Sequence, residues 1–298
     1  MPARMQVAAD SVAENEKIWS SSDFPYQCLL DFKRTTAFQA AIQATVSPGD
    51  VVVDAGAGSG ILSFFAARAG AKRVYAVEVD GHLADCLRQS AAANGLGNVI
   101  EVIEGDIHEA SLPQGIDVFI CEMMETGLLD EMQVTAINSL RDRQVLGPDT
   151  LMIPYQYETF MELGYTDFNY YGFKILIPRH DWPHHAEGNT GWLANSYHPI
   201  CHPYRIGLTN LRQSIEPGVN ATFSLTASST GVINALRLSA RAHLTHGMPL
   251  GATNALNGDK IIPLPEATRV EAGQTFRVRM RYRMGAGLAS LQAQVLGG

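Results

Sequence analysis

The stretch VVVDAGAGSGILSFFAARAG, residues 51–70, decides the fold of this chain. An apolar run rich in β-branched valine predicts a buried strand over residues 51–56. The glycines at positions 56, 58 and 60 let the backbone turn sharply and approach a ligand without a Cβ in the way. The apolar residues that follow predict a helix over residues 61–70. A strand, a glycine-rich turn and a helix in this order are typical of nucleotide-binding α/β proteins.

The same alternation of strand and helix continues toward the carboxyl terminus. The pattern predicts strands at residues 73–80, 99–106 and 116–122, and a second helix at residues 82–95. Apolar strands that alternate with helices form an open parallel sheet with helices on both faces. We therefore expect a nucleotide-binding α/β domain at residues 46–150.

Regions of different texture flank this domain. Residues 1–45 are expected to form an N-terminal helical segment, because apolar side chains recur at helical spacing from residue 19 to residue 45. In the second half of the chain several segments alternate apolar and polar residues, most clearly TFRVRMRYRM at 275–284, which is the pattern of a half-buried antiparallel strand. We expect residues 151–298 to form a mainly β, barrel-like domain with an irregular insertion near residues 177–204.

A carboxylate stands near the end of each of the first three predicted strands: Asp54, Glu78 and Asp106. Asp54 would repel the diphosphate of a nicotinamide cofactor, but it can accept hydrogen bonds from a cationic amino-acid group. Glu78 can bind both hydroxyls of a ribose, and Asp106 can accept a hydrogen bond from the amino group of adenine. One such acid could be a helix cap, but three at successive strand ends indicate an adenosyl cofactor. S-adenosylmethionine fits better than NAD.

The charge distribution favours a cationic substrate. The net charge of −8 divides into −11 for residues 1–150, with 21 acids and 10 bases, and +3 for residues 151–298, with 9 acids and 12 bases. Binding to a nucleic-acid backbone needs clustered lysine and arginine, so we expect no nucleic-acid partner. The alternating arginines of residues 275–284 are expected to form a solvated strand face.

Cysteine spacing and hydropathy bear on the cellular setting. The four cysteines lie far apart and form no CxxC pair, which favours a reducing, cytoplasmic setting without a disulfide scaffold. No apolar stretch reaches the ~18–20 residues of a membrane span, so we expect no membrane partner. The histidines near residues 180–202 lack the spacing of a helical zinc site, so we expect no bound metal.

Two further motifs give the chain a family resemblance. Residues 31–35 (DFKRT) resemble the D-x-x-R-T helix of the protein arginine methyltransferases, and residues 122–131 (EMMETGLLDE) resemble their double-Glu loop. These enzymes are class I S-adenosylmethionine-dependent methyltransferases. The resemblance implies a Rossmann-like core, a C-terminal β-barrel, S-adenosylmethionine as cofactor and a homodimer formed through an arm of the barrel.

The resemblance also implies roles for individual residues. Arg34 is expected to bind the carboxylate of the cofactor, and Glu109 is expected to contact its adenine. Glu122 and Glu131 are expected to hold the substrate. A guanidinium is always protonated in water, and two carboxylates can hold it in a fork of charge-assisted hydrogen bonds while drawing charge from the attacking nitrogen.

The chain departs from the family around the substrate. Met123 and Thr126 replace an aromatic pair of the loop, and the Thr-His-Trp segment of the barrel falls at Thr253-Asn254-Ala255. The walls that would shape a tunnel for a peptidyl arginine are therefore reduced, and the substrate can be a peptide or a small guanidine- or amine-bearing molecule. Two alternatives stay open: a small-molecule O- or C-methyltransferase, in which the loop acids act on a hydroxyl, and a catalytically inactive cofactor-binding protein.

Overall fold

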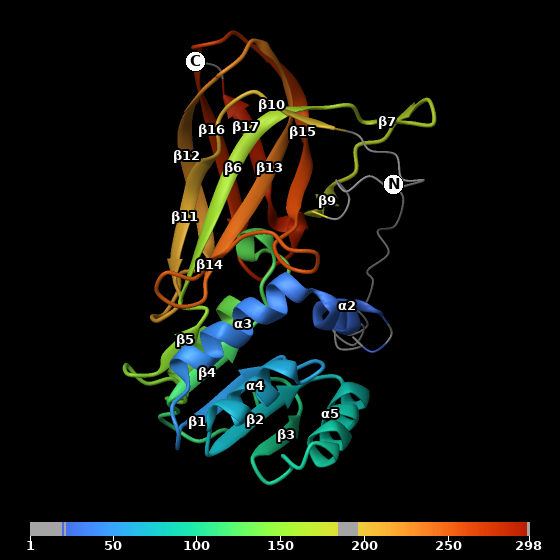
Figure 1. Ribbon diagram of the computed structural model, residues 1–298. Coiled ribbons are helices and arrows are strands. Elements are labelled where there is room, and N and C mark those ends of the chain that lie inside the picture. The colour runs from blue at the N-terminus through green and yellow to red at the C-terminus, as the bar shows by residue number, and fades with distance from the viewer. Residues whose placement is uncertain (1–19, 21, 184–195, 297–298) are drawn as a thin grey trace, which may run out of the picture.

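The computed structural model describes residue 20, residues 22–183 and residues 196–296. A part built from helices and a parallel sheet lies below a part built from long strands, as Figure 1 shows. No helix of the described residues is long and apolar enough to cross a membrane.

Two helices lead into the α/β part, where the sequence pattern suggested one. They are α2 (Phe24–Leu30) and α3 (Phe32–Thr45). The break falls at Asp31, whose carboxylate accepts a hydrogen bond from the backbone N–H of Arg34 at 3.0 Å and so caps α3. Trp19, at the start of the expected helix, lies outside the described residues.

Five parallel strands form the sheet of the α/β part, in the order β3-β2-β1-β4-β5. The strands are β1 (Val51–Ala55), β2 (Arg73–Glu78), β3 (Ile100–Glu104), β4 (Val118–Cys121) and β5 (Leu151–Ile153). The helices that follow them are α4 (Ile61–Ala69), α5 (Gly81–Ala93) and α6 (Gln133–Asp142). The predicted alternation is confirmed, and β5 extends the sheet past residue 150.

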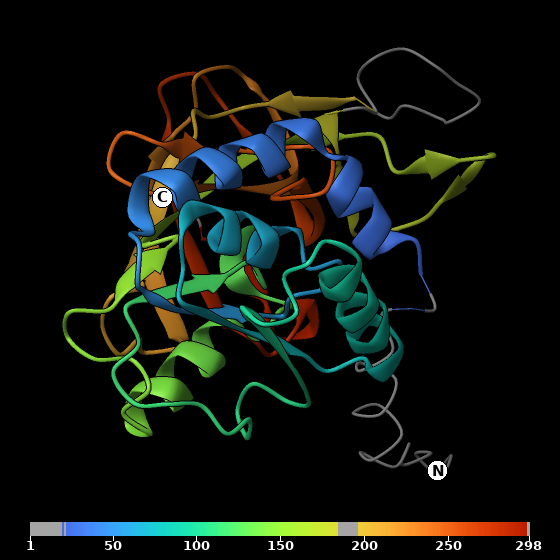
Figure 2. The same cartoon turned by 60° about the horizontal axis from the view of Figure 1, so that its bottom comes forward.

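Helices cover both faces of this sheet, as Figure 2 shows with α3 and α4 on one side and α6 on the other. Side chains alternate across a strand, so neighbouring residues of β1 join different cores. Val52 packs in the cluster that holds residues of α3, α4 and α5, whereas Val53 packs in the cluster that holds residues of α6.

The strand order sets the place of the ligand site. The chain moves outward from β1 through β2 to β3 and then crosses back to β4 on the other side of β1. The loops after β1 and β4 therefore diverge at the carboxyl edge of the sheet, which is where open α/β sheets bind ligands.

The second half of the chain is mainly antiparallel β structure, as predicted. One sheet has the order β10-β6-β13-β15-β9, with β11 also paired to β6 and β14 to β13; another has the order β12-β16-β17. A two-stranded hairpin, β7-β8, projects from it. The strands are β6 (Gln156–Thr166), β7 (Asn169–Tyr170), β8 (Phe173–Lys174), β9 (Arg179–Asp181), β10 (Tyr197–Pro199), β11 (Tyr204–Asn210), β12 (Gly218–Thr226), β13 (Gly231–His243), β14 (Pro249–Leu250), β15 (Asp259–Val270), β16 (Thr275–Arg283) and β17 (Gln292–Leu296).

Strand β16 follows the predicted alternation. Phe276, Val278, Met280 and Tyr282 are buried, and the arginines between them are exposed. Part of the predicted irregular insertion is ordered into strands, because β9 pairs with β15 and β10 pairs with β6. His184 and His185 of that insertion lie outside the described residues.

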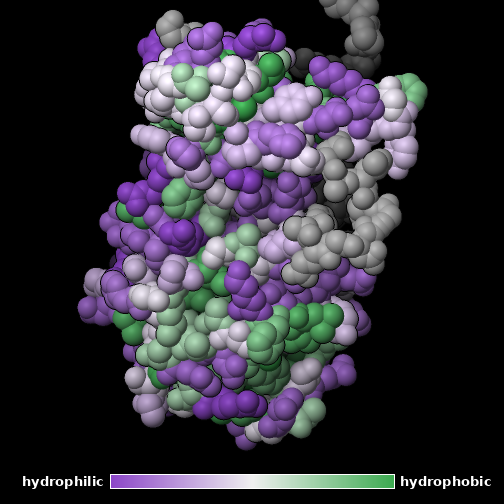
Figure 3. All heavy atoms as spheres, turned by 45° about the horizontal axis from the view of Figure 1, so that its top comes forward, coloured by the Kyte–Doolittle hydropathy of each residue, from purple (hydrophilic) through white to green (hydrophobic). Residues whose placement is uncertain are grey.

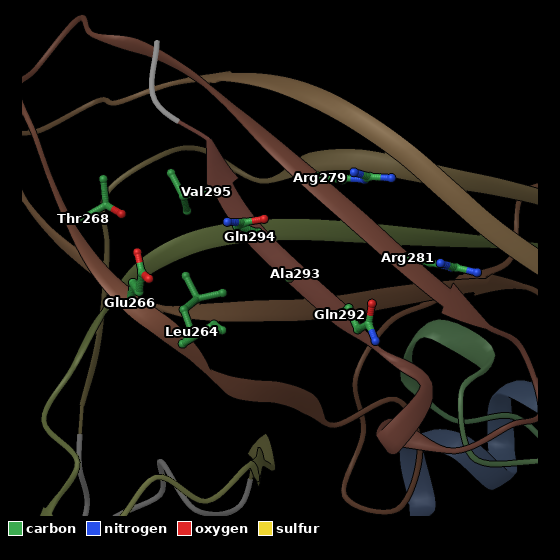
Figure 4. A pocket seen from close by; sticks show the side chains of 10 residues that line it. Leu264, Glu266, Thr268, Arg279, Arg281, Gln292, Ala293, Gln294 and Val295 are labelled. Carbon is green, nitrogen blue, oxygen red and sulfur yellow. The ribbon is translucent and has the colours of Figure 1, made fainter.

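The sheet of β6, β13 and β15 and the sheet of β12, β16 and β17 share one hydrophobic core, but they do not join into a closed barrel. Between β15 and β17 lies a cavity of about 430 Å³. Figure 4 shows Glu266 and Thr268 of β15 on one side of it and Gln294 of β17 on the other. In the described part of the chain β17 pairs only with β16, and β9 covers β15 only at residues 259–261. The edges that face this cavity are therefore unpaired.

Candidate active site

The glycine-rich turn after β1 has the geometry that the sequence predicted. Gly56, Gly58 and Gly60 have φ values of +68°, +53° and +80°, a region that favours glycine. A Cβ at Gly56 would meet the side chain of Met123 at 2.6 Å. A Cβ at Gly58 would meet no atom closer than 4.0 Å, so the backbone there faces open space. A ligand can therefore lie directly against this turn.

Asp54 lies at the end of β1 and is only 1% exposed. Its Oδ2 accepts a hydrogen bond of 2.6 Å from the Ser63 hydroxyl of α4. Burial raises the pKa of Asp54 to about 7, against the lowering effect of the Ser63 hydrogen bonds and of the Arg34 charge. The carboxyl group of Asp54 thus lies beneath the turn, where a cationic ligand group would strongly stabilise its ionised form.

Glu78 ends β2, beside the same turn. Its Oε2 accepts a hydrogen bond of 2.7 Å from the backbone N–H of Gly58, and its Oε1 accepts one of 2.9 Å from that of Asp80. Burial raises the pKa of Glu78, while these backbone hydrogen bonds oppose the rise. Glu78 therefore both fixes the glycine turn and borders the space in front of it.

Asp106 and Glu109 lie in the turn after β3. The Asp106 carboxylate accepts hydrogen bonds from the backbone N–H of His108 at 2.9 Å and pairs with its Nδ1 at 2.6 Å. The side chain of Glu109 is exposed, and its backbone N–H donates to the Asp106 carbonyl at 2.9 Å. Both residues lie at the carboxyl edge of the sheet, but Asp106 already has a partner in His108.

Arg34 of α3 is buried and pairs directly with Glu122, although the sequence interpretation gave the two residues different ligands. Its Nη2 contacts Glu122 Oε2, and its Nη1 donates to the Cys28 carbonyl at 3.2 Å. Its Nε is buried without a partner in the described residues. Burial raises the pKa of Glu122, and the Arg34 charge counteracts that rise. Arg34 and the first acid of the double-Glu loop therefore occupy one site.

The double-Glu loop runs from β4 to α6 and contains a 3-10 turn, η1 (Thr126–Leu128). Its second acid, Glu131, is half-buried and precedes the N-cap residue of α6, Met132. In the described part of the chain Glu131 has no hydrogen-bond or ion-pair partner. Burial raises its pKa well above the usual range, and the neighbouring charges of Glu122 and Glu125 add to this effect. Glu131 is thus a carboxyl group available to a ligand.

Several residues around this loop carried no functional prediction. Lys260 of β15 contacts both Glu125, at 2.5 Å, and Asp130. His180 of β9 contacts Glu125 at 3.2 Å, and the Tyr157 hydroxyl of β6 donates to the Glu125 carbonyl at 3.1 Å. In the sequence, His180 falls within the predicted irregular insertion near residues 177–204. The sequence did offer a signal for Lys260, because it occupies the same alternate positions of the strand as the apolar residues Ile262 and Leu264.

The segment at the position of the family's Thr-His-Trp motif packs against α3. The backbone N–H of Ala255 donates to Asp31 Oδ2 at 2.7 Å, and Thr253 is 1% exposed. The exposed Lys33 Nζ reaches the Ala252 carbonyl at 3.0 Å. A backbone amide of this segment thus contacts the acid of the DFKRT motif.

The residues at the carboxyl edge fit S-adenosylmethionine. The unpartnered Nε of Arg34 suits a carboxylate, the buried Asp54 suits an ammonium group, and Glu78 suits a ribose. The open space at Gly58 lets such a ligand approach the backbone. Side chains at this edge are therefore suited to a carboxylate, an ammonium group and a ribose.

Comparison with known proteins agrees with this geometry. Residues 32–151 match the family model of the TRM5/TYW2 methyltransferase domain. The uncharacterised protein MJ1452 of Methanocaldococcus jannaschii is 30% identical over 270 residues, which cover 91% of this chain and 95% of that protein. Protein arginine N-methyltransferase PRMT10 of Oryza sativa subsp. japonica is 34% identical over 182 residues, covering 60% of this chain and 47% of the plant protein.

A solved structure shares the fold over nearly the whole chain. The Trypanosoma brucei PRMT1 enzyme-prozyme complex with AdoHcy superimposes with a TM-score of 0.70, at 22% identity, over 91% of this chain and 96% of that chain. The chain belongs to one family with the archaeal protein MJ1452, and it is a class I S-adenosylmethionine-dependent methyltransferase that resembles the protein arginine methyltransferases.

Proposed function

We propose that this enzyme methylates a nitrogen of a guanidine- or amine-bearing substrate, a peptide or a small molecule, that Glu122 and Glu131 hold. The observation that carries the proposal is the pair of acids at the two ends of the loop after β4. Glu122 already binds a guanidinium, that of Arg34, and Glu131 has no partner in the described residues. A carboxylate that pairs with the guanidinium of Arg34 has the chemistry to receive one from a substrate.

In this proposal the cofactor lies against the glycine turn. Arg34 would bind its carboxylate, Asp54 its amino group, Glu78 its ribose, and Asp106 and Glu109 its adenine. When bound, S-adenosylmethionine supplies an electrophilic methyl group on a sulfonium. The protein's contribution is to hold the substrate nitrogen in line with that methyl group and to draw positive charge away from the nitrogen.

The raised pKa of Glu131 supports a second candidate, a small-molecule O-methyltransferase. A carboxylate whose pKa is raised is a stronger base than an ordinary one and can accept a proton from a substrate hydroxyl. The two candidates differ in Glu122: a guanidinium needs both carboxylates, whereas a hydroxyl needs one base.

The test uses Glu122→Gln and Glu131→Gln, with Glu101→Gln on the exposed edge of β3 as the matched control. Release of S-adenosylhomocysteine is measured against free arginine, simple amines, arginine-rich peptides and hydroxylated metabolites. We expect each loop variant to lower kcat on a cationic nitrogen by about 10²–10³-fold with cofactor affinity within a few-fold of wild type. If Glu122→Gln keeps near-normal turnover, the paired-acid role is wrong. If no substrate is methylated, the chain is a cofactor-binding protein without turnover.

We also propose that the enzyme is a homodimer. The large apolar side chains exposed in the described residues include Tyr171 and Phe173 on the β7-β8 hairpin, Tyr26 and Leu30 on α2, and Phe32 at the start of α3. Figure 3 shows hydrophobic residues gathered over the lower, α/β part on the visible face, while the β part is mostly hydrophilic. Burying such residues against a second copy would remove them from water.

The domain limits at residues 46–150 and 151–298 remain a proposal of the same kind.

A further inference from the structure

The loop that carries the proposed catalytic acids is crowded with negative charge. Within ten residues it holds four acids: Glu122, Glu125, Asp130 and Glu131. Like charges close together and away from water disfavour one another's ionised forms, so a loop of this composition needs a compensating cation. Arg34 neutralises Glu122, which leaves the other three acids to be compensated.

Lys260 is the cation placed for this purpose. It is 1% exposed, and buried lysines are rare unless they are paired. Its Nζ contacts Glu125 Oε2 at 2.5 Å and also contacts Asp130 Oδ2. Lys260 lies at the start of β15, in register with Leu238 of β13 and His180 of β9, so its backbone is fixed by strands on both sides.

The remaining contacts of the inner acids come from the same region. His180 contacts the second oxygen of Glu125 at 3.2 Å, and Leu288 N–H donates to Asp130 Oδ1 at 2.8 Å. The backbone is held as well, since the Thr126 hydroxyl donates to the Gly258 carbonyl at 2.7 Å. Contacts from β15, from the adjacent β9 and from Gly258 and Leu288 thus hold the middle of the loop in place.

We infer that Lys260 is a positioning residue that neutralises Glu125 and Asp130, so that Glu131, which has no cation partner in the described residues, attracts the substrate cation together with Glu122, which Arg34 holds in place. This inference rests on the proposed function of the two outer acids. Lys260 itself does not touch the ligand. It holds the loop in place and keeps the inner acids from raising the pKa of Glu131 further, because both inner carboxylates lie close enough to act on it.

The charged and titratable groups around Glu131 come from the loop and from the elements packed against it. In the described residues they are Glu122, Glu125 and Asp130 of the loop, Arg34 of α3, Cys28 of α2, Cys121 of β4 and Tyr157 of β6. Substrate capture requires ionised Glu131, so kcat/KM rises with pH through the pKa of Glu131. Without Lys260, the negative charges of Glu125 and Asp130 act on Glu131 uncompensated. The acidic limb of the pH profile, where kcat/KM rises with pH, therefore moves to higher pH.

The experiment measures the pH profile of kcat/KM for Lys260→Met, Lys260→Arg and Asp130→Asn, with the exposed Lys72→Met as matched control. We expect Lys260→Met to shift the acidic limb upward by about one pH unit and to lower kcat/KM by about 10–100-fold at neutral pH. Lys260→Arg should restore most of the profile. Asp130→Asn should move the limb downward, because it removes a negative neighbour. A limb that stays in place in both Lys260→Met and Asp130→Asn overturns the inference.

A second readout needs no substrate and separates this inference from the proposed function. Hydrogen exchange of the amides of residues 122–131 is compared in wild type and Lys260→Met, with S-adenosylhomocysteine affinity and thermal unfolding as checks on the fold. Faster exchange in this loop alone supports the positioning role even if no nitrogen substrate is found. Unchanged exchange in a folded variant contradicts the role. If Lys260→Met does not fold, hydrogen exchange of Asp130→Asn, which loses one of the two ion pairs of Lys260, is compared with that of Lys260→Arg, which keeps both charges paired.

Discussion

Lowering the pH is expected to weaken cofactor binding, because Asp54 must be ionised to bind the cofactor's amino group. In the ligand-free protein burial raises the pKa of Asp54 to about 7. A cation bound beside the carboxylate lowers that pKa again, so binding releases a proton whenever the free protein holds one. Affinity should therefore be constant above about pH 7 and fall below it.

The size of the effect follows from one titrating group. One pH unit below the pKa about one tenth of Asp54 is ionised, so the Kd should rise about tenfold per unit. If binding returns the pKa of Asp54 to its ordinary value of 3.8, the total loss of affinity in acid reaches about a thousandfold. Glu78 contributes in the same direction, because burial also raises its pKa.

Calorimetric titration with S-adenosylhomocysteine, which carries the same amino-acid group, measures the effect. Runs at several pH values in buffers of different ionisation enthalpy give both the Kd and the number of protons released. Asp54→Asn is the control: its affinity should be low at neutral pH and change little toward acid. A wild-type Kd that does not change between about pH 8 and pH 6, or an equal slope in Asp54→Asn, would refute the assignment of Asp54.

Three further predictions concern affinity, stability and assembly. Glu78→Gln should weaken S-adenosylhomocysteine binding by about 10–100-fold in calorimetry, because a charge-assisted acceptor is lost; an unchanged Kd would remove Glu78 from the ribose site. Phe38→Ala should lower the free energy of unfolding by about 3–5 kcal/mol in urea titration, because Phe38 is fully buried between α3 and the sheet; a loss below about 1 kcal/mol would mean that the site collapses around the gap. Replacing Tyr171 and Phe173 by Ser should give a monomer in sedimentation experiments, whereas a dimer that persists would place the interface elsewhere.

The features that could be predicted from sequence are local ones. The turn at Gly56 to Gly60 and the acids at strand ends are read within a few residues, and the parallel sheet follows from the alternation of elements. The break at Asp31 was also readable, because an aspartate that precedes a helical run is a cap signal. The apolar spacing continues across Asp31, however, so periodicity alone predicts a single helix.

The partners of the site could not be predicted, because they are distant in the chain. Arg34 and Glu122 are 88 residues apart, and Lys260 lies 135 residues from Glu125. Neither contact leaves a periodic pattern. Lys260 gave a faint signal, since it precedes Ile262 and Leu264 at alternate positions of one strand, and both of these are buried. A lysine at such a buried position needs a carboxylate as partner. Which carboxylate it contacts depends on how the two halves of the chain fold together.

The open seam between β15 and β17 has a consequence for how this protein behaves at high concentration. Exposed strand edges invite other chains to add a strand, which leads to aggregation. Here the edges meet polar and charged side chains such as Glu266, Arg279 and Gln294, and Pro265 in β15 has no N–H to offer an incoming strand. Polar side chains thus protect the seam although it stays open, and substitutions that made these side chains apolar are expected to favour fibres and precipitates.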